Sequence, residues 1–214
     1  MKTIYSFLGD FYHDHDIIYP AVQAAVSEMP NTRLIDTQIR NLELALEKTP
    51  HAIIMDIENR VNPEAKVVDN WLTDELDEKI TSYVRAGGGF VAMHAALASY
   101  EPSTKYTQMI KGYFLSHPQD NCPVKFTSNK NLPFENTTPF DYKIMDEHYF
   151  LKVDEENTTV FMHSQSEHGD NYGGWYHPYG AGKVMCIVPT HRKDGFEHPE
   201  TIRLIRQSLQ WVLG

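Results

Sequence analysis

Short apolar runs and amphipathic stretches alternate along the first part of the chain. The apolar runs at residues 2–8, 32–36 and 52–57 predict buried strands, and the stretches at 16–29 and 39–48 predict the helices between them. Strands that alternate with helices form a mainly parallel sheet with helices on both faces. The pattern therefore predicts an α/β protein, a three-layer sandwich with one central sheet.

A clearer helix and strand follow. Apolar residues at helical spacing predict a helix over residues 73–85, with Thr73 as its N-cap and the glycines at 87–89 ending it. The next strand covers residues 90–93 and stops at His94. Because ligands bind at the carboxyl ends of strands in open α/β sheets, we expect His94 to face a crevice.

The pattern changes after residue 112, where prolines and asparagines become frequent. Strand-like pieces at residues 124–127, 141–153 and 158–163 predict a small antiparallel extension of the sheet. The chain closes with a strand at residues 183–188 and an amphipathic helix, whose apolar face is formed by Ile202, Ile205, Leu209 and Val212. Since no linker divides these segments, we expect a single domain over residues 1–214.

Charge and composition exclude several classes of function. The formal net charge is −10 and there is no run of Lys and Arg, so the attraction that underlies nucleic-acid binding is missing. No stretch approaches the roughly 20 apolar residues of a membrane span, and a membrane role is not expected. Cys122 and Cys186 do not resemble a disulfide framework, which favours a reducing cytoplasm.

Histidine is the residue type that stands out, with 11 in 214 residues. Several of these histidines, and one glutamate, follow strand-like runs, from which an α/β sheet can gather side chains into one crevice. The candidates are His13, His94, His117, Glu147 and His191. If His13, His94 and His191 meet, they could hold a divalent Zn, Mn or Fe ion, although no short His-x-x-x-His spacing supports a metal.

A second interpretation uses the same residues without a metal. Glu147 or His94 would act as general base and another histidine as acid, which suits proton transfer beside the carbonyl of a keto sugar. Asp146 and Glu147 are neighbours on a strand and point to opposite faces, so only one can serve the site. We predict that it is Glu147.

Aromatic residues cluster with glycines around Trp175, in the segment from residue 171 to 180. Aromatic faces suit the apolar side of a sugar ring, although an aromatic-rich turn packed on the sheet is an equally good interpretation. Gly180-Ala181-Gly182 precedes a strand instead of following one, so it is not a dinucleotide-binding fingerprint. No nucleotide cofactor is expected.

Several motifs, taken in order along nearly the whole chain, resemble the ThuA-like family of trehalose-utilisation proteins. They are Tyr12-His13-Asp14, Gly87 to His94, Ser116-His117-Pro118, Asp146-Glu147-His148-Tyr149 and Thr190-His191. The family is similar in fold to class I glutamine amidotransferases, which are flavodoxin-like. Those enzymes carry a nucleophilic cysteine where this chain has His94, and glutaminase activity is therefore not expected.

The resemblance implies a protein for the use of trehalose or a related disaccharide or keto sugar. An enzyme of this kind would be a lyase, isomerase or hydrolase. We expect His94, Glu147 and His191 to be catalytic, and the small carbohydrate to be bound by His13, His117, Tyr149 and Trp175. The alternative is a non-catalytic protein that binds a sugar or a protein partner, and either form could be a homo-oligomer.

Overall fold

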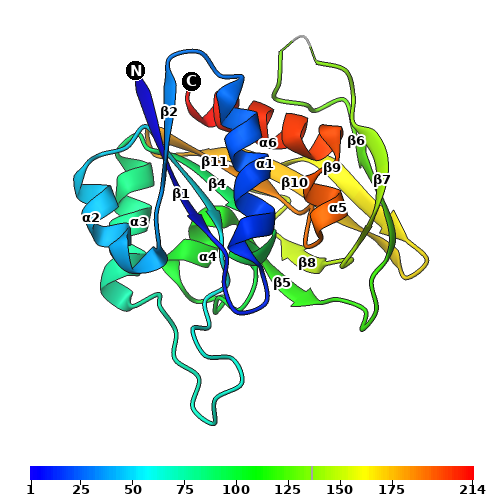
Figure 1. The fold of residues 1–214 in the computed structure, drawn as a ribbon, viewed down its shortest axis with the longest axis horizontal. Coiled ribbons are helices and arrows are strands. Elements are labelled where there is room, and N and C mark those ends of the chain that lie inside the picture. The colour runs from blue at the N-terminus through cyan, green and yellow to red at the C-terminus, as the bar shows by residue number, and fades with distance from the viewer. Residues whose placement is uncertain (136) are drawn as a thin grey trace.

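The structure is a computed structural model that describes residues 1–135 and 137–214. Within these residues, nine strands form one sheet in the order β2-β1-β3-β4-β11-β10-β9-β6-β7 (Figure 1). The strands are β1 (Lys2–Leu8), β2 (Thr32–Asp36), β3 (Ala52–Asp56), β4 (Gly89–Met93), β6 (Cys122–Ser128), β7 (Asp141–Asp146), β9 (Thr159–Ser166), β10 (Gly169–Tyr179) and β11 (Gly182–Ile187).

The sheet is mixed. The prediction of a mainly parallel sheet with a small antiparallel extension was wrong about how much of the sheet is antiparallel. Strands β2, β1, β3, β4 and β11 run parallel, whereas β10, β9, β6 and β7 are joined to one another, and to β11, by antiparallel pairing. Short connections such as the turn between β9 and β10 allow only antiparallel neighbours, because a parallel crossover needs a dozen or more residues. The antiparallel strands therefore continue the central sheet.

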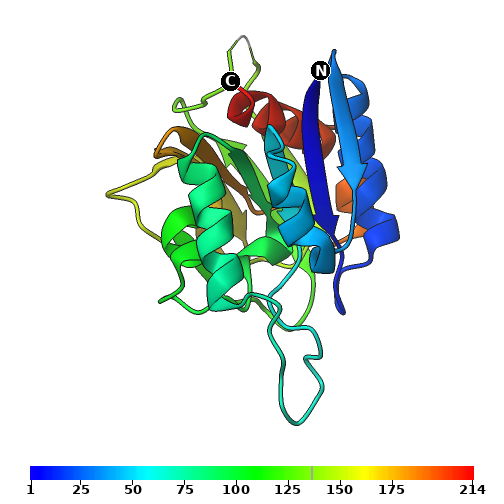
Figure 2. The ribbon, with the colours of Figure 1, turned by 90° about the vertical axis from the view of Figure 1, so that its left-hand side faces the viewer.

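Helices cover both faces of the sheet. On one face α1 packs against α5 and α6, and on the other α3 packs against α2 and α4, as the two ribbon views show (Figures 1 and 2). The helices are α1 (His15–Ser27), α2 (Leu42–Glu47), α3 (Asp74–Arg85), α4 (Lys105–Ile110), α5 (Lys193–Phe196) and α6 (Pro199–Val212), with short 3-10 helices η1 (Ile39–Asn41) and η2 (His94–Leu97). None of the helices described here is long and apolar enough to cross a membrane.

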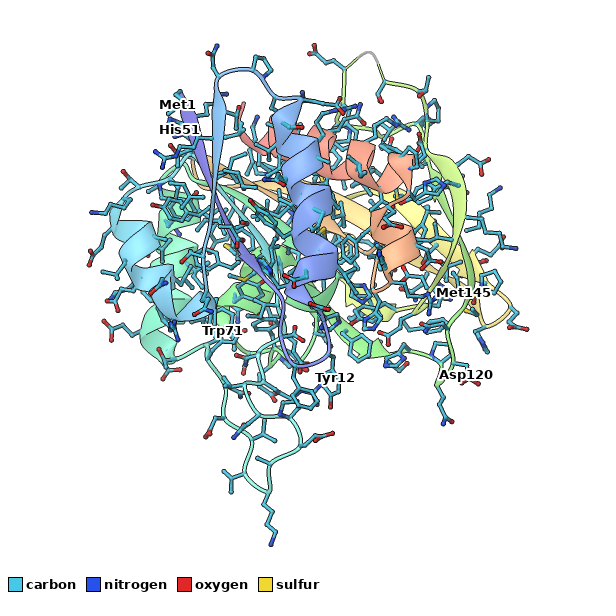
Figure 3. The ribbon with its side chains drawn as sticks, viewed as in Figure 1. Met1, Tyr12, His51, Trp71, Asp120 and Met145 are labelled. Atoms are coloured by element: carbon cyan, nitrogen blue, oxygen red, sulfur yellow. The ribbon has the colours of Figure 1, made fainter. Side chains whose placement is uncertain are left out.

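Two further segments lie at the end of the molecule where the parallel strands terminate. The residues predicted as one strand over 141–153 divide into β7 and β8 (Phe150–Val153), and β8 pairs with β5 (Gly112–Ser116) in a separate two-stranded sheet. A long loop between β3 and α3 extends away from the same end (Figure 1). Tyr12 lies near the base of this loop, and Trp71 belongs to the loop itself (Figure 3).

Candidate functional site

Four of the predicted residues meet at the carboxyl end of the sheet. His13, His94, Glu147 and His191 each offer one ligand atom, and these four atoms lie within 4.8 Å of one another. His13 follows β1, His94 follows β4 and His191 follows β11, which are parallel strands whose carboxyl ends share one edge. The fold therefore gathers the three imidazoles as expected.

Glu147 comes from the antiparallel part of the sheet, because it follows β7, the edge strand that is last in the sheet order. The end of β7 is tied to the site by Asp146, whose Oδ1 accepts a 2.8 Å hydrogen bond from the backbone N–H of His191. Asp146 thus holds the backbone of one site residue while Glu147 presents its carboxylate to the cluster. The two neighbours therefore have different partners, and Glu147 lies just past the end of β7.

His94 lies at a sharp turn between β4 and η2, with a φ of 34° that is uncommon for a residue with a side chain. Its ring is fully buried, and Nδ1 lies 2.9 Å from the carbonyl oxygen of Val188, which can only accept. That contact fixes the proton on Nδ1 and leaves Nε2 directed at the cluster, 3.8 Å from Glu147 Oε2. Tyr149 stacks on the ring at 4.1 Å between centroids.

His13 is oriented by a carboxylate that the sequence analysis missed. Asp10 Oδ1 lies 2.7 Å from His13 Nδ1, so Nε2 is the free nitrogen of this buried ring. Burial acts to raise the pKa of Asp10, but its hydrogen bond and charge interaction with His13 keep that pKa below its ordinary value. The three-residue spacing between Asp10 and His13 was the available signal, since a histidine that binds a metal usually donates its other ring N–H to a carboxylate or a carbonyl oxygen.

Asp56 is a second residue that the sequence analysis missed. It is the last residue of β3, is fully buried, and accepts the backbone N–H of Ala95 at 2.8 Å, which supports the turn that carries His94. Burial raises the pKa of Asp56 to about 6, against the lowering effect of the nearby His94 and His13. Its position at the end of a buried strand would have identified it by the same rule that identified His94.

The charges of the cluster are strongly coupled. Burial lowers the pKa of His94, yet the carboxylates of Glu147, Asp146 and Asp56 raise it to about 9. Burial and the charge of His94 lower the pKa of His191 to about 4, and the neighbouring imidazoles bring the pKa of Glu147 down to about 2 against the effect of its burial. Near neutral pH these shifts favour a protonated His94, a neutral His191 and an ionised Glu147.

The donor set fits a divalent transition metal. His13 Nε2, His94 Nε2 and His191 Nδ1 are buried, and none has a hydrogen-bond partner among residues 1–135 and 137–214. Glu147 Oε2 lies 3.5 Å from His191 Nδ1 and completes the group. Three imidazole nitrogens with one carboxylate suit Zn, Fe or Mn, and a metal ion would take the place of the proton on His94.

A cavity of about 410 Å³ opens beside the cluster. Its lining includes five predicted residues, namely His13, His117, Glu147, Tyr149 and His191. Its volume lies within the roughly 300–1,000 Å³ of small-molecule sites. An adjoining cavity of about 970 Å³ shares Tyr12 and His13 with it, so the two form neighbouring hollows at the same end of the sheet.

Trp175 is the predicted substrate-binding residue that the structure does not bring to this cavity. Its side chain has no exposed surface, and its indole N–H donates to the carbonyl oxygen of Ile110 at 2.7 Å. The ring also packs closely over Gly112, where an added Cβ would lie only 2.5 Å from the indole. Trp175 packs in the core and has no surface with which to contact a bound sugar.

Comparisons with known proteins agree with this architecture. A family model described as "Trehalose utilisation" (ThuA) matches residues 31–212. No curated protein sequence matches the chain. Among solved structures, a ThuA-like protein from Parabacteroides merdae has a TM-score of 0.76 at 10% identity, covering 99% of this chain and 90% of that one.

Two other solved structures show the same fold. A ThuA-like protein from Bacteroides uniformis has a TM-score of 0.71 at 16% identity, covering 99% of this chain and 91% of the other. A β-galactosidase from Rahnella sp. R3 has a TM-score of 0.64 at 11% identity; the match covers all of this chain but 31% of the enzyme. At these identities the likeness concerns the fold.

Proposed function

The chain belongs to the trehalose-utilisation (ThuA) family, and on this premise we propose that it is an enzyme acting on a small carbohydrate with a divalent metal ion. His13, His94, Glu147 and His191 would hold the ion. The observation that carries the proposal is the convergence of their four ligand atoms within 4.8 Å, with three buried imidazole nitrogens that have no other partner in the described part of the chain. Buried polar atoms are otherwise nearly always hydrogen-bonded.

The protein's own residues would prepare the site for catalysis. When bound, the metal would supply Lewis-acid polarisation of a sugar carbonyl or hydroxyl oxygen. Asp10 and the Val188 carbonyl hold the His13 and His94 rings in the tautomers that a ligand requires. His117 lines the cavity and has Nδ1 engaged by the Pro118 carbonyl at 2.6 Å, so its Nε2 is the nitrogen available to move a proton to or from the substrate.

The shape of the site supports a substrate larger than one sugar ring. The 410 Å³ cavity beside the cluster adjoins the 970 Å³ cavity, and Tyr12 lines both. Tyr12 is about half exposed and could pack against a sugar ring that extends from one hollow into the other. Trehalose, a related disaccharide or its keto derivative would suit this arrangement.

Glutaminase chemistry is not part of the proposal, because a thiolate nucleophile needs a cysteine at the turn that His94 occupies. Both cysteines are free and buried, and burial raises the pKa of the Cys186 thiol well above its ordinary value. Two free thiols also support the proposed cytoplasmic location.

The metal content of the purified protein tests the proposed ligands. Purified wild-type protein should contain about one Zn, Mn or Fe ion per chain, and His191→Ala should lose most of it because a ligand is gone. Elemental analysis measures the metal, and turnover of trehalose and 3-keto-trehalose measures the activity. His163→Ala, which alters an exposed histidine on β9, is the matched control and should keep both.

Two results would contradict the proposal. Full turnover by protein freed of metal would show that the chemistry does not need the ion. Binding of these sugars by the metal-loaded protein, without any product, would instead support the non-catalytic sugar-binding alternative.

A further inference from the structure

Glu58 is a buried carboxylate on the loop after β3, outside the metal cluster but in the lining of the same cavity. Resting on the proposed function, we infer that Glu58 is a specificity-determining residue whose carboxylate accepts a hydrogen bond from a hydroxyl group of the bound sugar. Its side chain is 2% exposed, and its Oε1 has no hydrogen-bond partner in the described part of the chain.

The backbone of Glu58 is held at both ends of the residue. Its N–H donates to Asp10 Oδ2 at 2.8 Å, and its carbonyl oxygen accepts the indole N–H of Trp71 at 2.9 Å. Asp10 is also the carboxylate that orients His13. Glu58 is therefore fixed relative to the cluster through a single shared residue, as a group that recognises substrate beside a metal must be.

The side chain is equally constrained, but through one oxygen. Glu58 Oε2 accepts from Arg60 Nη2 at 2.7 Å, from Arg60 Nε at 3.1 Å and from Ser99 Oγ at 2.8 Å. Glu58 forms an ion pair with Arg60, and a carboxylate in an ion pair can only accept hydrogen bonds. Because leaving a buried charged oxygen unpaired is costly, Oε1 would gain from a hydrogen-bond donor supplied by a molecule in the cavity that Glu58 lines.

The surrounding charges favour a neutral hydroxyl over an acidic group. Among the described residues that line the cavity, Arg60 alone is a lysine or arginine; its guanidinium is engaged by Glu58 and lies 5.6 Å from the centre of the Tyr12 ring. A carboxylate or phosphate placed beside Glu58 Oε1 would meet a like charge at short range. A sugar hydroxyl would instead form a charge-assisted hydrogen bond.

The test is Glu58→Gln in the metal-loaded protein, with binding of trehalose and 3-keto-trehalose measured by calorimetry. Gln keeps the size of the side chain and an oxygen for Arg60 and Ser99, but it removes the charge. We expect sugar affinity to fall on the order of 10- to 100-fold, as for loss of a charged hydrogen bond, with unchanged metal content. Glu64→Gln, an exposed glutamate on the same loop, is the matched control and should bind like the wild type.

Monodeoxy analogues of the better-bound sugar identify the hydroxyl. One analogue should bind the wild type as weakly as the intact sugar binds Glu58→Gln, and should lose no further affinity on the variant. Unchanged sugar affinity of Glu58→Gln would overturn the inference, and so would tighter wild-type binding of glucuronate or glucose 6-phosphate. If the wild-type protein holds its metal but binds none of these sugars, the inference about Glu58 is overturned as well. If the wild-type protein contains no metal, the proposed function is overturned instead.

Discussion

Two buried histidines of this chain have opposite electrostatic environments. His177 has a partner on each ring nitrogen, with Met109 O and Thr158 Oγ1 both 2.8 Å away, and burial lowers its pKa to about 4. His94 is equally buried but has one nitrogen without a partner among the described residues, and nearby carboxylates raise its pKa to about 9. The unpartnered nitrogen distinguishes the candidate ligand from the core histidine.

The lowered pKa of His177 predicts a stability change with pH. Between the ordinary pKa of 6.5 and about 4 the unfolded chain binds a proton that the folded chain does not, so stability is lost as the pH falls through this window. The loss at pH 4 should be on the order of 3 kcal/mol.

Urea unfolding at a series of pH values measures this loss. His177→Gln should make the free energy of unfolding less dependent on pH over that range, because the titrating ring is gone. His163→Gln, an exposed histidine, should keep the wild-type slope. If the free energy of unfolding of His177→Gln depended on pH as steeply as that of the wild type, the lowered pKa of His177 would be contradicted.

Candidate site residues could be predicted from the sequence wherever their signal was local. His94 and His191 follow apolar runs, and they were identified because ligands bind at the carboxyl ends of strands in open α/β sheets. Glu58 and Asp10 also lie just past apolar runs, but the hydrogen bonds that tie Glu58 to Asp10 and to Trp71 join segments far apart in the chain and could not be predicted. The prediction that Trp175 binds the substrate failed for a related reason. The sequence shows an aromatic residue beside glycines but does not show which part of the protein packs over it.

Elements with strong local signals match their predicted positions closely. The helix expected over residues 73–85 is α3, and its predicted cap is present, with the Thr73 side chain accepting from the Leu76 N–H at 3.3 Å. The segment at 39–48 divides into η1 and α2, and the segment at 141–153 divides into β7 and β8. Such divisions depend on tertiary partners, which periodicity does not contain.

The cap on α3 predicts a measurable change in stability. Thr73→Ala removes the acceptor for the Leu76 N–H and should lower the free energy of unfolding by about 1 kcal/mol. Thr73→Ser keeps a hydroxyl at the same position and should retain most of that stability. Denaturant unfolding compares the three proteins, and equal losses in both variants would show that the threonine methyl group matters instead of the cap.

For the whole molecule, the sheet order was the part that the sequence could not supply. The βαβ pattern correctly predicts β1 to β4 as parallel neighbours, but nothing local shows that β11 pairs with β4 or that β7 becomes the edge strand. That long-range arrangement brings Glu147 to the imidazoles. The residues of the site could therefore be proposed individually, whereas the route by which they meet could not.

A metal held by all four residues would join the parallel and antiparallel halves of the sheet. Chelation of the ion should therefore lower the Tm of the wild type, since a ligand that binds only the folded state stabilises it. At a free metal concentration of about 100 times the Kd the stabilisation is about 2.7 kcal/mol. Thermal unfolding with and without chelator measures the shift.

His191→Ala, which lacks one ligand, serves as the comparison for the chelation experiment. Its Tm should respond little to chelator. An equal response in the wild type and the variant would show that the chelator acts elsewhere on the protein.

The four clustered side chains are spread along the chain from residue 13 to residue 191. Translation supplies the first of these imidazoles before β2, but the last one only after β11 has been made. A nascent polypeptide therefore has no complete cation-binding site until β11 has been synthesised. If the protein binds a metal, the ion can be held by all four residues only after that point, and a chain that terminates before β11 would lack one of the ligands.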